Sequence, residues 1–167
     1  MVSFRSFIAA TLAFAAPALA GDLPEPTGAP VLTVTGAIGQ TNRNGAAVFD
    51  LDMLRALGER DVRTTTIWTA GEHVFTGVSL DTLLAALGAS GARLSATAIN
   101  DYSVEIPVSD AAPDGPIVAY EMDGKEMSRR DKGPLWVIYP YDAKAEYRSE
   151  VVYSRSIWQL DRIAVLD

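Results

Sequence analysis

The 167-residue chain has a formal net charge of −7 and no cysteine. The acidic balance argues against nucleic acid and anionic membranes as partners, because both favour clustered Lys and Arg side chains. The lack of cysteine excludes disulfides, thiolate nucleophiles and cysteine metal ligands, and the single histidine excludes a multi-histidine metal site within one chain.

The first 20 residues have the layout of a secretory signal peptide. A short basic start ends at Arg5, an apolar run follows, and Ala18-Leu19-Ala20 forms a small-residue cleavage site before Gly21. The apolar run is shorter than the ~20 residues that a membrane span needs. We therefore expect cleavage, export to the periplasm and a soluble product of about 147 residues that does not insert into a membrane, which is long enough for one domain.

The mature chain is predicted to begin with a tail and a first strand. Residues 21–30 are rich in proline and glycine, which indicates a linker or N-terminal tail. The domain is predicted to follow over 31–167, starting with an alternating strand at 31–38. Asp50 then precedes an apolar helix over 51–57, where its carboxylate suits the N-cap position.

The remainder of the chain is dominated by short strand patterns. Two β-branched strands are predicted at 62–67 and 74–78, and Ser79 is expected to cap a short helix over 80–88. Asp123-Gly124 is a two-residue hairpin turn signal. Strands are predicted at 94–100, 102–108, 117–122, 125–127, 135–140 and 158–165.

These elements predict an α+β fold with a mainly β core and two or three short helices in a single domain. Strand–helix alternation stops after residue 90, which disfavours a parallel doubly wound sheet.

Four segments of the chain resemble the motifs of one known family, in the same order. They are FTGVSLDTLLAALGA (75–89), NDYSVEIPV (100–108), DGKEMSRRDKGPLWVIYP (123–140) and SIWQLDRIAV (156–165). They resemble, in turn, the W-x-G-V-x-L-x-x-L-L segment, the D-G-Y strand start, the N-G-x-x-L…G-x-P-x-R hairpin and strand, and the closing V-K-W-x-x-x-I of one family. That family is the sulfite-oxidase-like, molybdopterin-binding oxidoreductase domain. The resemblance implies its fold over nearly the whole mature chain.

The resemblance also implies a molybdopterin cofactor and oxidoreductase activity, and here the sequence departs from the family. In the enzymes a cysteine upstream of the W-x-G-V segment ligates molybdenum, whereas residues 64–70 contain no sulfur. Trp136 stands where the G-x-P-x-R pattern has its arginine. We therefore expect a small, cysteine-free branch of the family without its catalytic group, in which molybdopterin is implied by the resemblance alone.

Candidate ligand-binding residues occur first in two polar stretches. Trp68 could stack on a ligand and His73 could make a polar contact at a pocket mouth. Asn100, Asp101 and Tyr102 form a bend between two strands, which the resemblance places beside the family's pocket. Each residue also has a purely structural alternative. Trp68 could cover the sheet edge, His73 could face solvent, and residues 100–102 could serve only to form the turn.

The last third of the chain supplies the other candidates. Tyr139 and Tyr141 end a buried strand and could wall a small-molecule site. If Arg148 and Arg155 converge with Tyr141 and Tyr153, they would form an anion site in a loop over 148–156. The alternative is tyrosine packing beside a solvated face of surface ion pairs.

Three functions remain open on the sequence. The first is a non-catalytic periplasmic module that binds a small ligand, anionic if the arginines converge, or a signalling partner, either periplasmic or membrane-bound. The second is a molybdopterin-dependent oxidoreductase or its subunit, and the third is a structural adaptor. The missing thiolate disfavours the second function, and the aromatic and arginine residues favour the first over the third.

Overall fold

The structure is a computed structural model that describes residues 23–167, so the predicted signal peptide lies outside the described residues. Its elements in chain order are β1 (Leu32–Gly36), β2 (Ala47–Phe49), α1 (Leu51–Ala56), β3 (Arg60–Thr65), β4 (Glu72–Ser79), α2 (Leu80–Ala86), β5 (Arg93–Ala98), β6 (Ser103–Pro107), η1 (Val108–Asp110), β7 (Ile117–Met122), β8 (Lys125–Glu126), β9 (Leu135–Ile138), η2 (Ala145–Tyr147), α3 (Glu150–Arg155) and β10 (Trp158–Leu166). The predicted mainly β, α+β fold with two or three short helices is confirmed.

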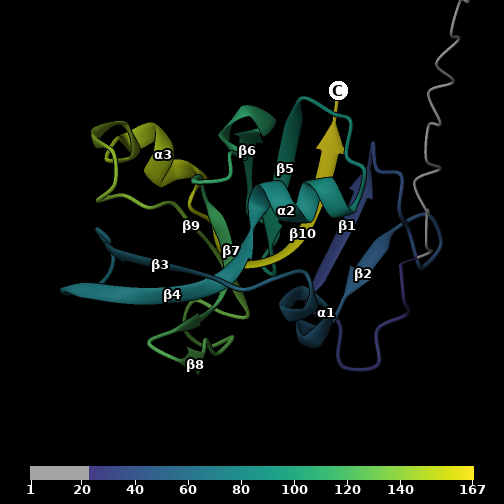
Figure 1. Ribbon diagram of the computed structural model, residues 1–167, viewed down its shortest axis with the longest axis horizontal. Coiled ribbons are helices and arrows are strands. Elements are labelled where there is room, and N and C mark those ends of the chain that lie inside the picture. Colours follow the sequence, from purple (N-terminus) through teal and green to yellow (C-terminus); the bar gives the residue numbers. More distant parts are fainter. Residues whose placement is uncertain (1–22) are drawn as a thin grey trace, which may run out of the picture.

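The strands form one sheet in which β10 is central. The main path runs β2-β1-β10-β9-β7-β4-β3, with β5 and β6 branching from β10 and β8 from β7. β10 pairs in parallel with β1 and antiparallel with β5 and β9. In Figure 1 the long β3–β4 hairpin and α3 lie at the same end of the molecule. None of the helices in residues 23–167 is long and apolar enough to span a bilayer.

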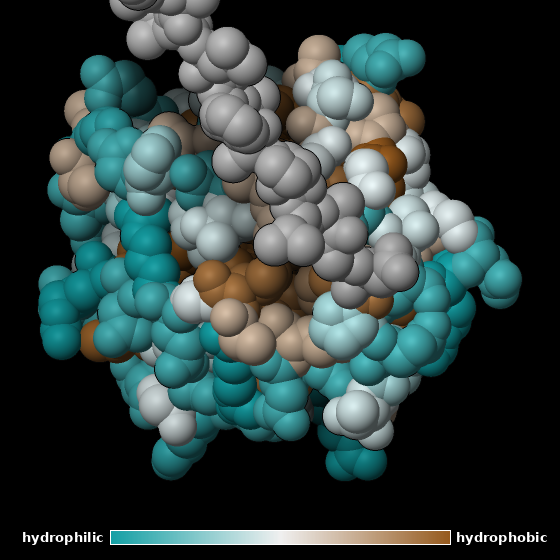
Figure 2. Space-filling view, turned by 45° about the vertical axis from the view of Figure 1, so that its right-hand side comes forward, coloured by the Kyte–Doolittle hydropathy of each residue, from teal (hydrophilic) through white to brown (hydrophobic). Residues whose placement is uncertain are grey.

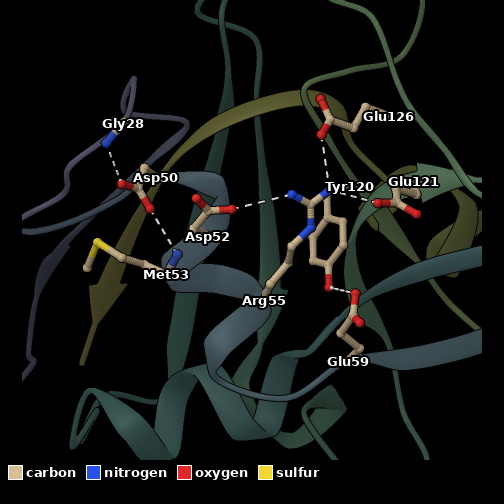
Figure 3. A network of polar contacts seen from close by, with 9 residues as sticks. All are labelled: Gly28, Asp50, Asp52, Met53, Arg55, Glu59, Tyr120, Glu121 and Glu126. Atoms are coloured by element: carbon tan, nitrogen blue, oxygen red, sulfur yellow. Dashed lines mark hydrogen bonds and ion pairs between the residues drawn. The ribbon is translucent and has the colours of Figure 1, made fainter.

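Asp50 caps α1 as predicted and also holds the start of the described chain. One carboxylate oxygen accepts from Met53 N–H at 2.9 Å, and the other accepts from Thr27 and Gly28 N–H at 2.8 and 2.7 Å. Figure 3 shows the carboxylate between Gly28 and the first turn of the helix. These hydrogen bonds, led by that from Gly28, lower the pKa of Asp50.

A second polar network fastens α1 to the sheet (Figure 3). The guanidinium of Arg55 donates to Glu121 on β7 at 2.8 Å and to Glu126 on β8 at 3.0 Å. Its carbon lies 5.5 Å from the centre of the Tyr120 ring, whose hydroxyl donates to Glu59 at 2.9 Å. The ion pairs raise the pKa of Arg55, so the helix is held by a cation that stays charged.

The edge strand β2 was not predicted, because three residues give too short a pattern. Its backbone pairs with a side chain on the free side: Asn42 Nδ2 donates to Val48 C=O at 2.8 Å, and Val48 N–H donates to Asn42 Oδ1 at 2.8 Å. The amide therefore satisfies groups that an edge strand otherwise leaves open to another chain.

Two local predictions were wrong. The Ser79 hydroxyl does not cap α2 and donates instead to Asp81 Oδ1 at 2.9 Å. The predicted loop over 148–156 contains α3, which begins after Ser149. The Ser149 hydroxyl accepts from Val152 N–H, and Val152 is buried against the core. A serine N-cap and one buried apolar side chain are enough to hold this short helix once the sheet is present.

The core runs along the sheet and holds several large aromatic side chains. Trp136, Tyr120, Tyr139, Tyr141, Phe49 and Phe75 are all fully buried. On the face drawn in Figure 2, hydrophilic residues predominate and apolar residues gather in a hollow near the centre. The aromatic residues of the core continue toward the end of the sheet where β3–β4 and α3 meet, and that end holds the main cavity.

Candidate functional site

The main pocket has a volume of about 340 Å³, which lies within the range of small-molecule sites. It opens between the β3–β4 loop, the β5–β6 turn, the end of α3 and the start of β10. Its lining residues are uncharged: Trp68, Ala98, Asn100, Tyr102, Tyr153, Ser154, Ser156, Ile157, Trp158 and Gln159.

Trp68 is the hub of the pocket's aromatic wall. Its ring centre lies 5.7 Å from that of Trp136, 5.8 Å from that of Tyr153 and 5.7 Å from that of Trp158, each in an edge-to-face arrangement. Such contacts are the preferred geometry for aromatic pairs. All three tryptophans of the chain therefore meet at this one site.

A short turn presents Trp68 to the cluster. The strand predicted over 62–67 ends at Thr65, and the Thr66 hydroxyl accepts from the N–H groups of Trp68 and Thr69 at 3.1 and 3.0 Å. The hydroxyl takes the place of the backbone acceptors that a neighbouring strand would offer to these two N–H groups, which is how threonine competes with strand pairing.

Behind the wall, Ser156 ties three elements together. Its backbone oxygen accepts from Trp136 Nε1–H at 3.1 Å, and its hydroxyl accepts from the Tyr141 hydroxyl at 2.6 Å while donating to Val152 C=O at 2.9 Å. Burial raises the pKa of Tyr141, so its hydroxyl remains a proton donor. The end of α3 is thereby fixed against β9.

Two non-glycine residues with left-handed backbone flank the pocket. Asp101, with φ of 66°, lies between the lining residues Asn100 and Tyr102, and Gln159 has φ of 52° where the register of β10 shifts. Conformations of this kind cost about 1–3 kcal/mol each and gather at functional sites.

Four of the predicted site residues line this pocket together: Trp68, Asn100, Tyr102 and Tyr153. Tyr141 is buried behind them, with its ring 6.3 Å from Trp68 and 5.5 Å from Tyr153. Trp68, Tyr141 and Tyr153, which were singled out from separate parts of the sequence, therefore form one cluster.

The charged candidates lie outside the lining. Arg155 Nη1 contacts Asp110 at 2.9 Å, and the Tyr139 hydroxyl donates to the same carboxylate at 2.7 Å. Asp101 pairs with Arg162 at 2.8 Å, and Arg148 is exposed. Asp110 thus connects η1 to Arg155 at the end of α3 and to Tyr139 after β9, and neither Arg148 nor Arg155 lines the pocket.

Sequence reasoning missed the wall that β10 and the end of α3 provide. Trp158 and Gln159 fell within a predicted alternating strand, and Ser154 and Ser156 within the predicted loop. The one available signal was Trp158 itself, an indole in the segment similar to the family's closing motif.

His73 lies away from the pocket lining, in a contact with the β7–β8 turn. Its Nδ1 is 2.7 Å from Asp123 Oδ2 and its Nε2 is 3.0 Å from Ala70 C=O, so the protonated ring can donate through both nitrogens. The hydrogen bond with Asp123 raises the pKa of His73, and the same bond lowers the pKa of Asp123.

This pair predicts a pH window for stability. The contribution of His73 is complete below its unfolded pKa, ~6.5, and is lost as pH rises through its raised folded value. The contribution of Asp123 is complete above its unfolded pKa, ~3.9, and is lost as pH falls through its lowered folded value. We expect urea unfolding to show that His73→Gln destabilises the protein at pH 5 more than at pH 9, and an equal loss at both values would contradict the ion pair.

The donor set of the pocket does not fit molybdopterin. The chain has no cysteine to supply the thiolate on molybdenum. The lining residues are uncharged, and the cation Lys132 lies with its Nζ 4.4 Å from the centre of the Trp158 ring. Within residues 23–167, no three His, Asp or Glu side chains come together as a metal-binding group.

Comparisons with known proteins agree on the fold. The profile of the oxidoreductase molybdopterin binding domain family matches residues 51–146. Among solved structures, the chain is similar to the sulfane dehydrogenase SoxCD from Paracoccus pantotrophus, with a TM-score of 0.61 and 16% sequence identity over 81% of this chain. The chain spans only 38% of that protein's length. No curated protein matches the chain.

Proposed function

The chain belongs to the oxidoreductase molybdopterin-binding domain family, and from this premise we propose that it is a non-catalytic member that binds a small uncharged ligand in the pocket beside Trp68. We also propose that it acts in the periplasm, on the basis of the signal-peptide pattern in its first 20 residues.

The position of Trp68 carries this proposal. It lies in the segment 64–70, where the enzymes that the sequence resembles have their metal-ligating cysteine. An indole packed edge-on against four other rings gives that position an aromatic wall in place of a thiolate. Such a wall can hold a flat molecule by dispersion and burial but offers no ligand to a soft metal.

The makeup of the pocket supports a small ligand over a redox centre. Aromatic side chains with a few fixed polar groups are the usual lining of small-molecule sites. Residues 153–159 supply six of the ten lining residues and lie after the segment 51–146 that matches the family. The pocket therefore combines residues of the matched segment with a wall from the later part of the chain, which includes the segment 156–165 that resembles the family's closing motif.

The non-catalytic part of the proposal predicts the metal content. Protein purified from a host that makes molybdopterin should contain far less than one molybdenum atom per chain by elemental analysis. One molybdenum atom per chain would overturn this part and favour an oxidoreductase.

The binding part is tested with quinoline, a flat molecule that is uncharged at neutral pH. It should shift the indole N–H signals of Trp68 and Trp158 in ¹H–¹⁵N NMR and raise Tm. In Trp68→Ala the shift of the Trp158 signal and the rise in Tm should both be lost. Unchanged indole signals at millimolar quinoline would refute binding in this pocket.

A further inference from the structure

The loop 66–71, which carries Trp68, is held by few hydrogen bonds. Within residues 23–167, no backbone–backbone hydrogen bond ties it to a neighbouring strand. The Thr66 hydroxyl bonds inside the loop, where it accepts from the N–H groups of Trp68 and Thr69. The one hydrogen bond that reaches the loop from another described residue joins Ala70 C=O to His73 Nε2 on β4, at 3.0 Å.

The other ring nitrogen of His73 meets a carboxylate that is fixed independently. Asp123 Oδ2 lies 2.7 Å from Nδ1. The same aspartate accepts from Val74 N–H through Oδ1 at 3.0 Å, and its own N–H donates to Val74 C=O at 2.8 Å. The β7–β8 turn therefore stays on β4 without the imidazole, whereas the loop 66–71 has no such second hydrogen bond.

The protonation state of the ring decides whether both contacts exist together. An imidazolium ring has two N–H donors, whereas a neutral imidazole has one. The neutral ring keeps this N–H toward Asp123, because a charged acceptor forms the stronger hydrogen bond. An unprotonated Nε2 then faces Ala70 C=O, and two acceptors 3.0 Å apart repel each other.

Few other charged groups surround His73, whose side chain is 20% exposed. On its own strand the neighbouring ring is the uncharged Phe75, at 6.2 Å between ring centres. From β3, Arg63 contacts Glu72 at 3.2 Å. The hydrogen bond with His73 and, to a smaller extent, the charge of Arg63 lower the pKa of Asp123. Asp123 therefore stays ionised while His73 titrates near neutral pH.

We infer that His73 is a positioning residue of the pocket: its protonated ring holds the loop 66–71 with Trp68 in the aromatic wall, so ligand binding weakens as His73 loses its proton. This inference rests on the proposed function. Ala70 lies two residues after Trp68, whose indole lines the pocket. A wall that is already in place costs less to order when the ligand binds, and a freed loop occupies the binding position less often. The edge contacts of the indole remain in both states, so the effect is moderate.

The first test needs no ligand. In ¹H–¹⁵N spectra from pH 5 to 9, two loop signals should move with the same midpoint as the ring signals of His73. They are the Trp68 indole N–H and the amide of Gly71, which shares a peptide group with Ala70 C=O. Asp123→Asn keeps an oxygen for Val74 N–H but removes the charge, so it should lower the loop and His73 midpoints together. Asparagine tolerates the left-handed backbone of this position, where φ is 52°.

Asp61→Asn is the matched control. It removes a carboxylate from the other end of the same hairpin, where Asp61 accepts from the Thr76 hydroxyl. Both midpoints should stay nearly unchanged. Loop signals that do not titrate with His73, or that keep their midpoint when that of His73 falls in Asp123→Asn, would overturn the inference.

The second test measures binding with indole, a flat molecule that stays uncharged from pH 5 to 9. Its Kd should be about threefold higher at pH 9 than at pH 5, because one hydrogen bond that water partly replaces is lost. His73→Gln should remove this pH dependence. Since coupling between two sites is reciprocal, saturating indole should raise the His73 midpoint by the logarithm of the same factor.

The outcomes separate the two proposals. A Kd for indole that does not change with pH would overturn the role of His73, while the binding itself would still support the pocket. If neither quinoline nor indole shifts the tryptophan signals, the proposed binding function fails, and the ligand-binding part of the inference fails with it.

Discussion

Replacing Trp136 with alanine is expected to lower the free energy of unfolding by about 3–5 kcal/mol, the usual cost of truncating a fully buried tryptophan. The side chain is 0% exposed and packs against Trp68, Phe75 and Trp158. Its Nε1–H also satisfies the backbone oxygen of Ser156 at 3.1 Å. Urea unfolding followed by far-UV circular dichroism measures the change without relying on the tryptophan that is removed.

Trp158→Ala is the matched control. It removes the same side chain from the neighbouring position on β10, where 37% of the residue is already exposed. Its cost should stay below about 2 kcal/mol, because less apolar area is returned to water. If the two substitutions cost the same, Trp136 is not the anchor of the aromatic cluster.

Asp50→Ala should be the second severe substitution, at about 3 kcal/mol. It removes a helix N-cap, worth ~1 kcal/mol, and the acceptor of two further backbone N–H groups, at ~1 kcal/mol each. The carboxyl group lies in a residue that is only 3% exposed, so water replaces these bonds poorly. Because the folded pKa of Asp50 is lowered, this stability is present above ~3.9 and is lost as pH falls through the folded value.

Asp52→Ala provides the comparison within the same helix. Its side chain is 86% exposed, and its contact with Arg55 Nη1 is long, at 3.5 Å. Its removal should therefore change the free energy of unfolding by no more than about 0.5 kcal/mol. Equal losses in both variants would show that the effect comes from charge and not from the hydrogen bonds of Asp50.

Local signals predicted the elements whose causes are local. The Asp123-Gly124 turn between β7 and β8 and the Asp50 cap depend on residues within a few positions of each other. The helix α3 was missed because the segment 148–156 is polar enough to predict a loop, and because the buried position of Val152 depends on the folded sheet.

The candidate site divides in the same way. Aromatic residues such as Trp68 and Tyr153 could be singled out, because large aromatic side chains commonly pack together over the exposed end or face of a sheet. The arginine prediction depended on contacts that no spacing reveals: Arg155 meets Asp110, which lies 45 residues away in the chain. The place of Gln159 in the pocket lining depends on a register shift that interrupts an otherwise regular alternating pattern.

The central place of β10 determines the order in which the domain can form. This strand is the last in the chain, yet it pairs with β1, the first, and with β5 and β9. A chain synthesised from its N-terminus onward therefore holds β1 and β5 without their shared neighbour until β10 emerges. Pairing over such long sequence separations is slow and leaves strand edges open in the meantime. The sheet is thus expected to close in one late step after β10 has formed, and until then the open strand edges must be kept from pairing with other chains.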